Sequence, residues 1–327
     1  MNSIILPAAA CFLASSLAAP LVVRYLSNAG ITDVPNSRSS HEVPTPRGGG
    51  IASVVGVTAA AGLTLSGPIR TEVFLLLALP LAWAVIGFVD DTRGLPAVTR
   101  LTGQVATGAL LGYATHGLAG AIFGTVLACT VVNTVNFMDG INGITSLTTM
   151  AWSLTVLIIG YRADSQILTV LAAMALAAAA AFLPWNAPRA RLFLGDTGSY
   201  FFGGLITATI LAAPSIDTVL LALTPLTLYF ADVGFTLARR YAAGSSLLEA
   251  HREHVYQQLT NPGPLTHVQA SILVSGLSMV ISLSWLFTPI ALATLLTAAA
   301  TILYLWLPGL LTGQPTTRTH ERRARDR

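Results

Sequence analysis

The sequence contains very little charge, and no lysine at all. Only 9% of its 327 residues are charged, against about 25% in an ordinary soluble domain, whereas 54% are hydrophobic. All 17 basic residues are therefore arginines. With a mean hydropathy of +0.70, this composition excludes a soluble globular domain and indicates a polytopic membrane protein. A net charge of +3 gives no reason to expect nucleic acid as a partner.

Cysteine is also scarce. Cys11 and Cys129 are the only two cysteines, and both lie in apolar runs. Their number and setting disfavour a disulfide framework and a thiolate metal site. We expect two buried free thiols.

Long apolar runs dominate the rest of the chain, and about 20 apolar residues suffice to cross a bilayer. The eleven runs cover residues 3–23, 48–67, 73–89, 101–115, 118–136, 143–161, 167–184, 198–214, 218–238, 268–287 and 289–309. We predict an all-α transmembrane bundle of about eleven helices, with ten or twelve as alternatives. The first run lacks the basic start of a secretory signal, so we expect it to stay as a helix. Residues 1–312 are predicted to form one membrane domain, and residues 313–327 a basic tail on the inner leaflet.

The arginines predict the orientation. With eleven spans, fifteen arginines fall on one side and only Arg70 and Arg162 on the other. Cytoplasmic loops retain basic residues, so we expect the N-terminus outside and the C-terminus in the cytoplasm. The cytoplasmic loops are longer and hold every candidate site residue, so the chemistry is expected at that face.

The first two cytoplasmic loops offer glycines and paired carboxylates. Arg47 precedes Gly48 to Gly50, and backbone amides of such glycines can approach a phosphate. A flexible turn is the alternative. Asp90 and Asp91 follow the third apolar run, with Arg100 nearby, and suit a proton acceptor or a divalent-cation environment. A helix end solvated by lipid headgroups is the alternative.

The third and fourth loops add an amide and two more carboxylates. Asn136 and Asp139 are three residues apart and share a helix face. Asn133, within the span, is expected to hydrogen-bond between helices. Asp196 stands between glycines just before a helix, where it can reach a magnesium ion. A simple helix cap at Asp196 or Ser199 is the alternative.

The last candidates lie near residue 250. His251, Arg252 and His254 do not match the zincin pattern, which requires histidines four residues apart. We expect these histidines to reach a diphosphate or a sugar.

Asp232 lies inside a span, where it serves either ion coupling or an interhelical hydrogen bond. His116 is expected to be a turn residue on the far side.

Taken in order, Asp90-Asp91 and the stretches 136–143, 193–199 and 251–256 resemble the polyprenyl-phosphate hexosamine-1-phosphate transferases. This family, of the glycosyltransferase 4 type, includes phospho-N-acetylmuramoyl-pentapeptide transferase and the enzymes that initiate O-antigen and teichoic-acid synthesis. The resemblance implies a magnesium-dependent enzyme, with manganese as an alternative. It implies transfer of a sugar-1-phosphate from a UDP-sugar to undecaprenyl phosphate, with release of UMP. It also implies a bacterial inner-membrane location, and a homodimer is left open.

The resemblance also assigns roles. Asp196 looks like the magnesium ligand, and Asp90 and Asp91 look like the pair that deprotonates or positions the lipid phosphate. Asp139 is counted with them as catalytic. The remaining residues are expected to bind substrate: Arg47, Arg100, Asn136, Asn142, Phe193, His251, Arg252 and His254. Among these, Asn136 matches a nucleotide or diphosphate contact, as does Asp139, and Phe193 matches a residue that packs on uracil.

Two departures bear on the donor. Asn142 stands where many members carry a second aspartate, so a nucleotide contact there must use an amide. Tyr256 follows His254 where the peptidoglycan enzyme has consecutive histidines, which argues against a muramoyl-pentapeptide donor. The pattern looks like the branch that starts O-antigen or capsule chains with a UDP-N-acetylhexosamine, a 6-deoxy sugar being one alternative.

Two other functions compete with this one. An ion-coupled secondary transporter would use Asp232 and other membrane carboxylates, but it should show inverted repeats. A CDP-alcohol phosphotransferase would need Ala-Arg after Asp139-Gly140 and two further spaced aspartates, where this chain has Ile141 and Asn142.

Overall fold

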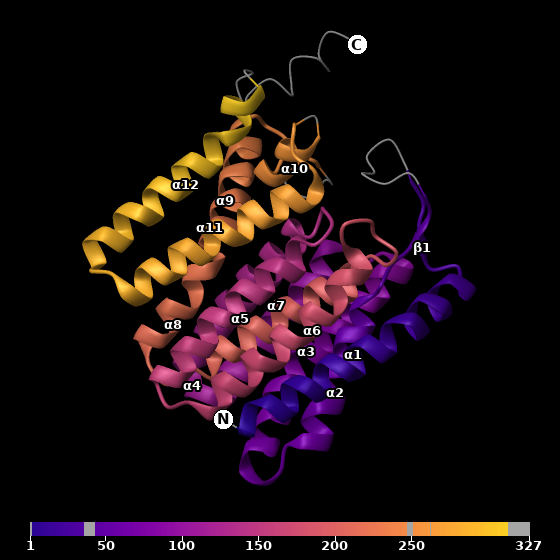
Figure 1. The fold of residues 1–327 in the computed structure, drawn as a ribbon, viewed down its shortest axis with the longest axis vertical. Helices are drawn as coiled ribbons and strands as arrows, with labels where there is room; N and C mark the ends of the chain where they lie inside the picture. Colours follow the sequence, from indigo (N-terminus) through magenta and orange to yellow (C-terminus); the bar gives the residue numbers. More distant parts are fainter. Residues whose placement is uncertain (1, 36–42, 247–250, 262, 313–327) are drawn as a thin grey trace.

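The computed structural model describes residues 2–35, 43–246, 251–261 and 263–312, and it is almost entirely helical (Figure 1). The elements in chain order are α1 (Asn2–Asn28), β1 (Thr32–Asp33), β2 (Thr45–Pro46), α2 (Gly50–Thr64), α3 (Gly67–Arg93), α4 (Ala97–Met138), α5 (Ile144–Arg162), α6 (Gln166–Asn186), α7 (Gly195–Leu211), α8 (Ile216–Leu223), the 3₁₀ turn η1 (Thr224–Leu226), α9 (Thr227–Ala242), α10 (Val255–Thr260), α11 (His267–Phe287) and α12 (Ile290–Thr312). The predicted all-α fold is confirmed, and the two short antiparallel strands pair only with each other.

Each of the eleven predicted runs is helical, but they are not eleven equivalent spans. Among the described residues, eight helices are long and apolar enough to cross a membrane. Eleven is reached only when the two arms of α4 are counted separately and the shorter α2 and α7 are included. The run predicted at 218–238 is α8 and α9, joined through η1 at Pro225. The predicted tail, residues 313–327, lies outside the described part of the chain.

Helix α7 is the centre of the bundle. All of its residues except Asp196 are buried, because α2, α3, α4 and α6 pack around it. Its sequence is rich in small residues: Gly203 lies against Val132 of α4, and Gly204 against Pro80 of α3. The one polar, partly exposed residue of this helix is therefore at its N-terminus.

Helix α4 is a hairpin, with non-helical backbone at His116 and Gly117. Its arms are joined by two reciprocal amide hydrogen bonds. Gln104 Nε2 donates to Asn133 Oδ1 at 3.1 Å, and Asn133 Nδ2 donates to Gln104 Oε1 at 2.5 Å. This confirms the expected interhelical role of Asn133. At the kink, His116 Nε2 lies 2.8 Å from the carbonyl oxygen of Leu211 and ties the turn to the end of α7.

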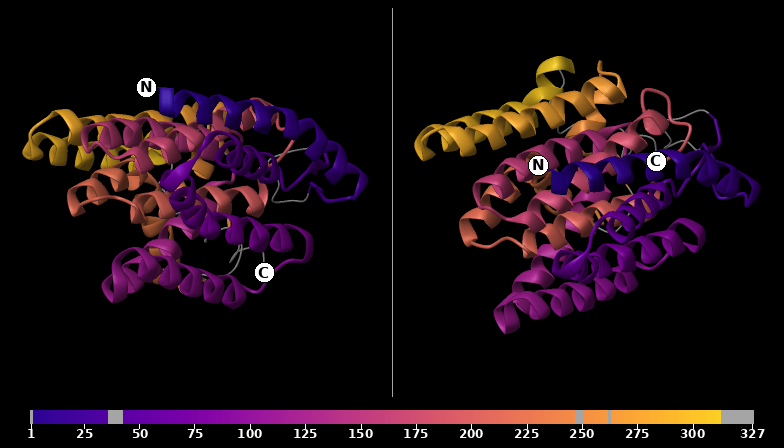
Figure 2. Two further views of the ribbon diagram at one scale, coloured as in Figure 1. Left: turned by 90° about the horizontal axis from the view of Figure 1, so that it is seen from below. Right: turned by 60° about the horizontal axis from the view of Figure 1, so that its bottom comes forward.

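The outer helices complete the bundle. Helix α1 packs on α2 and α6, α5 lies between α6 and α11, and α12 lies at one edge beside α11 and α9 (Figure 2). Cys11 and Cys129 are both free thiols, as predicted. Cys11 is buried as expected, but the predicted burial of Cys129 is wrong, because its side chain is only half-buried.

Candidate active site

The polar residues of the bundle gather at one end, around the N-terminus of α7. The C-terminal ends of α3 and α4, the loop before α2 and helix α10 all lie at this end (Figure 1). Nine of the eleven described arginines lie there too, and Arg70 and Arg162 lie at the other end. The predicted clustering on one side of the membrane is present in the fold.

Asp91 is the buried anchor of this end. Its side chain is 0% exposed and accepts from four groups. The backbone amides of Asp196 and Thr197 each donate at 2.9 Å, and the Thr197 hydroxyl donates at 2.7 Å. The fourth donor is Arg47 Nε at 2.7 Å. Asp91 therefore caps α7 from outside the helix, which satisfies amides that a helix start leaves unpaired.

Asp196 lies directly above this cap and is partly open, with 16% of its side chain exposed. Its Oδ1 accepts from Asn136 Nδ2 at 2.8 Å, and its Oδ2 accepts from Arg47 at 3.0 Å. Arg47 thus bridges two carboxylates, and Asn136 also donates to the Ser199 hydroxyl at 3.0 Å. The sequence brings Arg47, Asp91, Asn136 and Asp196 together as predicted, from four different segments.

The glycines after Arg47 connect the loop to the start of α7. The amide of Gly49 donates to Phe193 O at 2.8 Å, and that of Gly50 donates to Leu194 O at 2.9 Å. A Cβ on Gly195, which has a φ of +73°, would lie 2.6 Å from Asp91 Oδ2. The amides of Gly49 and Gly50 are therefore not available to a phosphate, because they hold the loop against the start of α7. Residues 36–42 of the same loop lie outside the described ranges.

Asp90, the neighbour of Asp91, faces a different group of donors. Its Oδ1 accepts from the amide of Leu95 at 2.7 Å, and its Oδ2 accepts from Arg100 at 3.1 Å and Tyr200 at 2.9 Å. Its side chain is 7% exposed, and that of Arg100 is 31% exposed. Arg100 thus reaches the surface of the site, and Asp90 keeps a small exposed fraction beside it, whereas the side chain of Asp91 has none. Sequence reasoning missed Tyr200, which lies one helical turn after Asp196.

Asp139 follows the last residue of α4 and has a contrasting environment. Thr145 Oγ1 donates to its Oδ1 at 2.5 Å. Burial raises the pKa of Asp139 to about 8, opposed by the Thr145 hydrogen bond. Its carboxyl group is therefore largely neutral at pH 7 and can donate a hydrogen bond.

The segment before α10 brings His254 to the same end. His254 Nδ1 lies 2.9 Å from Asp232 Oδ1, and its ring stacks on Phe137 at 6.2 Å. Phe137 lies between Asn136 and Asp139, so the third and fifth loops meet as expected. His251 lies 5.0 Å from His254 between ring centroids, and burial lowers the pKa of His251 to about 4, so it is neutral at pH 7.

Two arginines of α9 hold this segment through Glu253. Arg240 donates to Glu253 Oε1 at 2.7 Å, and Arg239 donates to the Glu253 carbonyl at 2.7 Å. Arg252, predicted to bind substrate, lies half-buried between His251 and Glu253.

Tyr256 is a second residue whose role the sequence did not reveal. It is buried, and its hydroxyl donates to Phe137 O at 2.9 Å. A Cβ on Gly140 would collide with this hydroxyl, so Gly140 is needed for the close approach of Tyr256. Tyr256 therefore supports residues 136–139 through these contacts. The tyrosine that departs from the consecutive histidines of the peptidoglycan enzyme has a structural role here.

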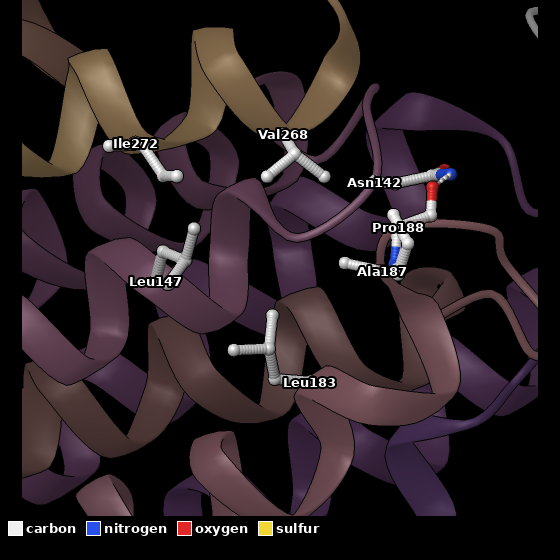
Figure 3. A pocket seen from close by; sticks show the side chains of 7 residues that line it. All are labelled: Asn142, Leu147, Leu183, Ala187, Pro188, Val268 and Ile272. Carbon is white, nitrogen blue, oxygen red and sulfur yellow. Dashed lines mark hydrogen bonds between the residues drawn. The ribbon is translucent and has the colours of Figure 1, made fainter.

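Asn142 and Phe193 lie at the edges of the site. Asn142 Nδ2 donates to Pro188 O at 3.1 Å, and Phe193, half-buried, is held by its main chain to Pro46 and Gly49. Beside Asn142 is an apolar cavity of about 360 Å³ (Figure 3). It is lined by Leu147, Leu183, Val268 and Ile272, with Ala187 and Pro188 at its rim.

Asp196 is the carboxylate of this donor set that could hold a magnesium ion. Within the described ranges, no cluster of three or more His, Cys, Asp or Glu side chains could hold a metal ion. Magnesium commonly takes one or two carboxylates and completes its shell with water and substrate phosphates. Asp196, partly exposed and beside Asn136, meets that requirement. Asp91 does not, because its oxygens are fully used.

Comparison with known proteins identifies the family. The chain is 30% identical over 291 residues to the decaprenyl-phosphate N-acetylglucosaminephosphotransferase of Mycobacterium tuberculosis (strain ATCC 25618 / H37Rv), covering 72% of this chain and 70% of that protein. The chain belongs to the polyprenyl-phosphate hexosamine-1-phosphate transferases. The family model "Glycosyl transferase family 4" matches residues 73–213, which include Asp90, Asp91, Asn136, Asp139 and Asp196. The family predicted from the sequence is confirmed.

Two further members of the polyprenyl-phosphate hexosamine-1-phosphate transferases match this chain at lower identity. A probable undecaprenyl-phosphate N-acetylglucosaminyl 1-phosphate transferase of Bacillus subtilis (strain 168) is 24% identical over 81% of this chain and 79% of its own length. The phospho-N-acetylmuramoyl-pentapeptide-transferase of Desulfitobacterium hafniense is 29% identical over 50% of this chain and 60% of its own length. The protein is thus a multi-pass membrane transferase of the glycosyl transferase 4 type.

The transporter alternative finds no support in Asp232. That carboxylate is 0% exposed and accepts five hydrogen bonds, from Thr236, His254, Val255, Tyr256 and Tyr304. A coupling carboxylate must exchange its ion with water, and both oxygens of Asp232 are engaged by the protein. The interhelical hydrogen bond, which the sequence left open, is the observed role.

Proposed function

We propose that this protein transfers an N-acetylhexosamine-1-phosphate from a UDP-sugar to undecaprenyl phosphate and releases UMP. One observation carries the proposal: Asp196, partly exposed at the N-terminus of α7, is held between Arg47 and Asn136. Phosphoryl transfer depends on positioning and on charge stabilisation, which such an array of carboxylate, amide and guanidinium supplies. The names of the relatives support the same reaction class.

In this reaction an oxygen of the lipid phosphate attacks the phosphorus that carries the sugar. The bond between that phosphorus and the oxygen bridging to UMP breaks, and UMP leaves with the bonding electrons. Asp90 is proposed to receive or orient the proton of the lipid phosphate, because it keeps a small exposed fraction beside Arg100. Asp91 is proposed to act as a positioning residue, because its burial keeps it from the substrate.

The donor is proposed to lie along the 136–142 and 193–196 segments. A neutral Asp139 offers a hydrogen bond to the diphosphate without adding negative charge. Asn136 is proposed to contact the diphosphate beside Asp196, the carboxylate that its amide orients. Arg47 balances the charge of the phosphates, Phe193 packs on uracil and Asn142 offers its amide. His251, Arg252 and His254 are proposed to contact the sugar or diphosphate. Asp196 would hold magnesium, or manganese in its place, and the metal would supply positive charge that offsets the charge of the phosphates.

The location follows from the distribution of arginines. With the arginine-rich end in the cytoplasm, the N-terminus lies outside and the site faces soluble UDP-sugars. We propose a bacterial inner-membrane enzyme that initiates a surface polysaccharide of the O-antigen or capsule type, with a 6-deoxy donor as one alternative. A homodimer stays a prediction.

The test supplies purified protein in lipid nanodiscs with undecaprenyl phosphate, magnesium and a panel of UDP-N-acetylhexosamines, and measures UMP and lipid-linked sugar. We expect product with at least one donor. Asp196→Asn should lower turnover at least about a hundredfold, in the range found when a group that stabilises transition-state charge is removed. Chelation of the divalent ion should stop the reaction.

The matched control is Asp217→Asn, at the exposed start of α8 on the opposite end of the bundle. It makes the same chemical change and should leave turnover unaltered. No product with any donor, or full turnover by Asp196→Asn, would overturn the proposed function.

A further inference from the structure

Asp232 is a fully buried carboxylate that accepts five hydrogen bonds, one more than Asp91. It lies on α9 and accepts from Thr236 of the same helix at 3.2 Å. Tyr304 of α12 donates to Oδ2 at 2.6 Å. The amides of Val255 and Tyr256, at the start of α10, donate at 3.0 and 3.2 Å. The fifth partner is His254 Nδ1, 2.9 Å from Oδ1.

These five partners differ in what they can do. Backbone amides only donate, so Val255 and Tyr256 require an acceptor at this position. The two hydroxyls and the imidazole can each donate or accept. An acceptor-only carboxylate makes His254 carry its hydrogen on Nδ1, because a neutral imidazole has one donor and one acceptor nitrogen.

We propose that Asp232 is a positioning residue for sugar-phosphate transfer, which fixes the tautomer and the orientation of His254 so that Nε2 alone serves the substrate. This inference rests on the proposed function and names a residue of the same reaction that acts through another side chain.

The ring contacts of His254 link Asp232 to the residues of the candidate site. The His254 ring stacks on Phe137 at 6.2 Å with an interplanar angle of 27°, and on Tyr256 at 5.8 Å with an angle of 20°. Phe137 separates Asn136 from Asp139 in the chain, and its carbonyl accepts the Tyr256 hydroxyl. Two aromatic faces and one carboxylate thus fix the ring, and with it the direction of Nε2.

The other titratable groups that face His254 do not replace this role. His251 lies 5.0 Å away between ring centroids and is neutral at pH 7. Glu253 is engaged by Arg240, at 2.7 Å. Tyr304 reaches the other oxygen of Asp232 and leaves the contact with His254 untouched.

A merely structural role for Asp232, as the cap of α10, predicts different behaviour, and a double-mutant cycle separates the two. His254→Asn keeps a donor near the place of Nδ1 and removes Nε2, whereas Asp232→Asn keeps the shape and removes the acceptor-only character. We expect Asp232→Asn to lower kcat/KM about 10- to 100-fold, as removal of an outer carboxylate that orients a histidine does elsewhere. In the His254→Asn background the same change should cost less than about threefold, because residues that act as a unit are non-additive.

Tyr304→Phe is the matched control. It removes one hydrogen bond from the same carboxylate, and we expect kcat/KM to stay within about threefold of wild type. All rates are referred to folded protein, measured by monodispersity and by a melting temperature above that of the assay. Equal losses from Asp232→Asn in the wild-type and His254→Asn backgrounds would overturn the proposal.

Nitrogen-15 NMR of histidine-labelled protein tests the tautomer without any turnover. The signal lost in His254→Asn identifies the residue among six histidines. We expect a protonated Nδ1 and an unprotonated Nε2 in the wild type, and a shift toward the other tautomer in Asp232→Asn. A wild-type His254 with its hydrogen on Nε2 overturns the inference even if transfer is robust. Absence of product from the wild type overturns the proposed function instead, and with it the catalytic part of this inference.

Discussion

Helices α7 and α10 begin in the same way. Each has its first amides capped by a buried carboxylate that belongs to another helix. Asp91 of α3 accepts the amides of Asp196 and Thr197, and Asp232 of α9 accepts those of Val255 and Tyr256. In both places the residues whose amides are capped lie next to a candidate functional group. The contact that caps the helix therefore also positions that group.

Besides backbone amides and hydroxyls, each carboxylate binds one side-chain nitrogen group, and the two caps differ in that partner. At α7 it is Arg47, which always carries its charge and only donates. At α10 it is His254, whose two ring nitrogens can differ in hydrogen-bond role. The α7 end thus holds a fixed positive charge beside Asp196, whereas the α10 end orients an imidazole ring. A buried carboxylate at a helix start sets geometry in both, and the side chain whose nitrogen it binds decides the chemistry.

The largest effect is expected from Asp91→Asn, which changes the cap of α7 and leaves that of α10 intact. An asparagine amide would face two backbone amides and leave Arg47 without its buried partner, and breaking a buried ion pair costs about 3–5 kcal/mol. We expect turnover to fall at least about a hundredfold, more than for Asp232→Asn, because Asp91 positions both Asp196 and Arg47 and small displacements of such groups cost about that much in rate. Transfer rate and melting temperature in detergent measure the two effects.

Membrane insertion of Asp91→Asn should be intact, because the apolar helices are unchanged. Asp217→Asn serves again as the matched substitution at the far end, with no expected effect. A smaller loss for Asp91→Asn than for Asp232→Asn would reverse the ranking of the two caps.

The comparison also shows what the sequence could reveal. Long apolar runs predicted every helix except the short α10, because burial in lipid leaves a strong compositional signal. The spacing of Asn136 and Asp139 and the position of Asp196 located the site, because each follows or precedes such a run. Composition did not separate the true spans from the short, central α2 and α7.

The roles of individual carboxylates could not be read in the same way. Asp90 and Asp91 are adjacent in sequence, yet one keeps a small exposed fraction and the other is enclosed by donors from two other segments. Asp232 looked like a lone membrane charge because its partners lie 22 and 72 residues away, at His254 and Tyr304. Such pairings depend on tertiary contacts, which one sequence does not display.

Asp139 adds a titratable carboxyl group to the comparison, because burial raises its pKa to about 8. If its neutral form binds the donor diphosphate, kcat/KM for the UDP-sugar should fall about tenfold per pH unit above pH 8. The folded state holds a proton that the unfolded state loses above about pH 4. Stability should therefore decline as pH rises from about 4 to 8 and level off beyond.

Asp139→Asn keeps a neutral side chain at every pH. We expect it to reduce turnover at pH 7 with insertion unaffected, and to abolish the decline above pH 8. The measurement is kcat/KM for the donor from pH 6.5 to 9.5. A decline that persists in Asp139→Asn would assign the titration to another group.

The smallest expected effect comes from a matched pair of hydroxyls, one at each cap. Thr197 donates to Asp91 at 2.7 Å, and Thr236 donates to Asp232 at 3.2 Å. Thr197→Val and Thr236→Val each remove one donor, keep the shape and leave every backbone amide capped. A single hydrogen bond contributes about 0.5–1.5 kcal/mol, so each variant should unfold slightly earlier than wild type. The shorter bond should matter more, and Thr197→Val should also slow transfer a few-fold because Thr197 adjoins Asp196. Melting curves and initial rates compare them, and a larger loss of activity in Thr236→Val would mean that the α10 cap controls transfer more tightly than the α7 cap.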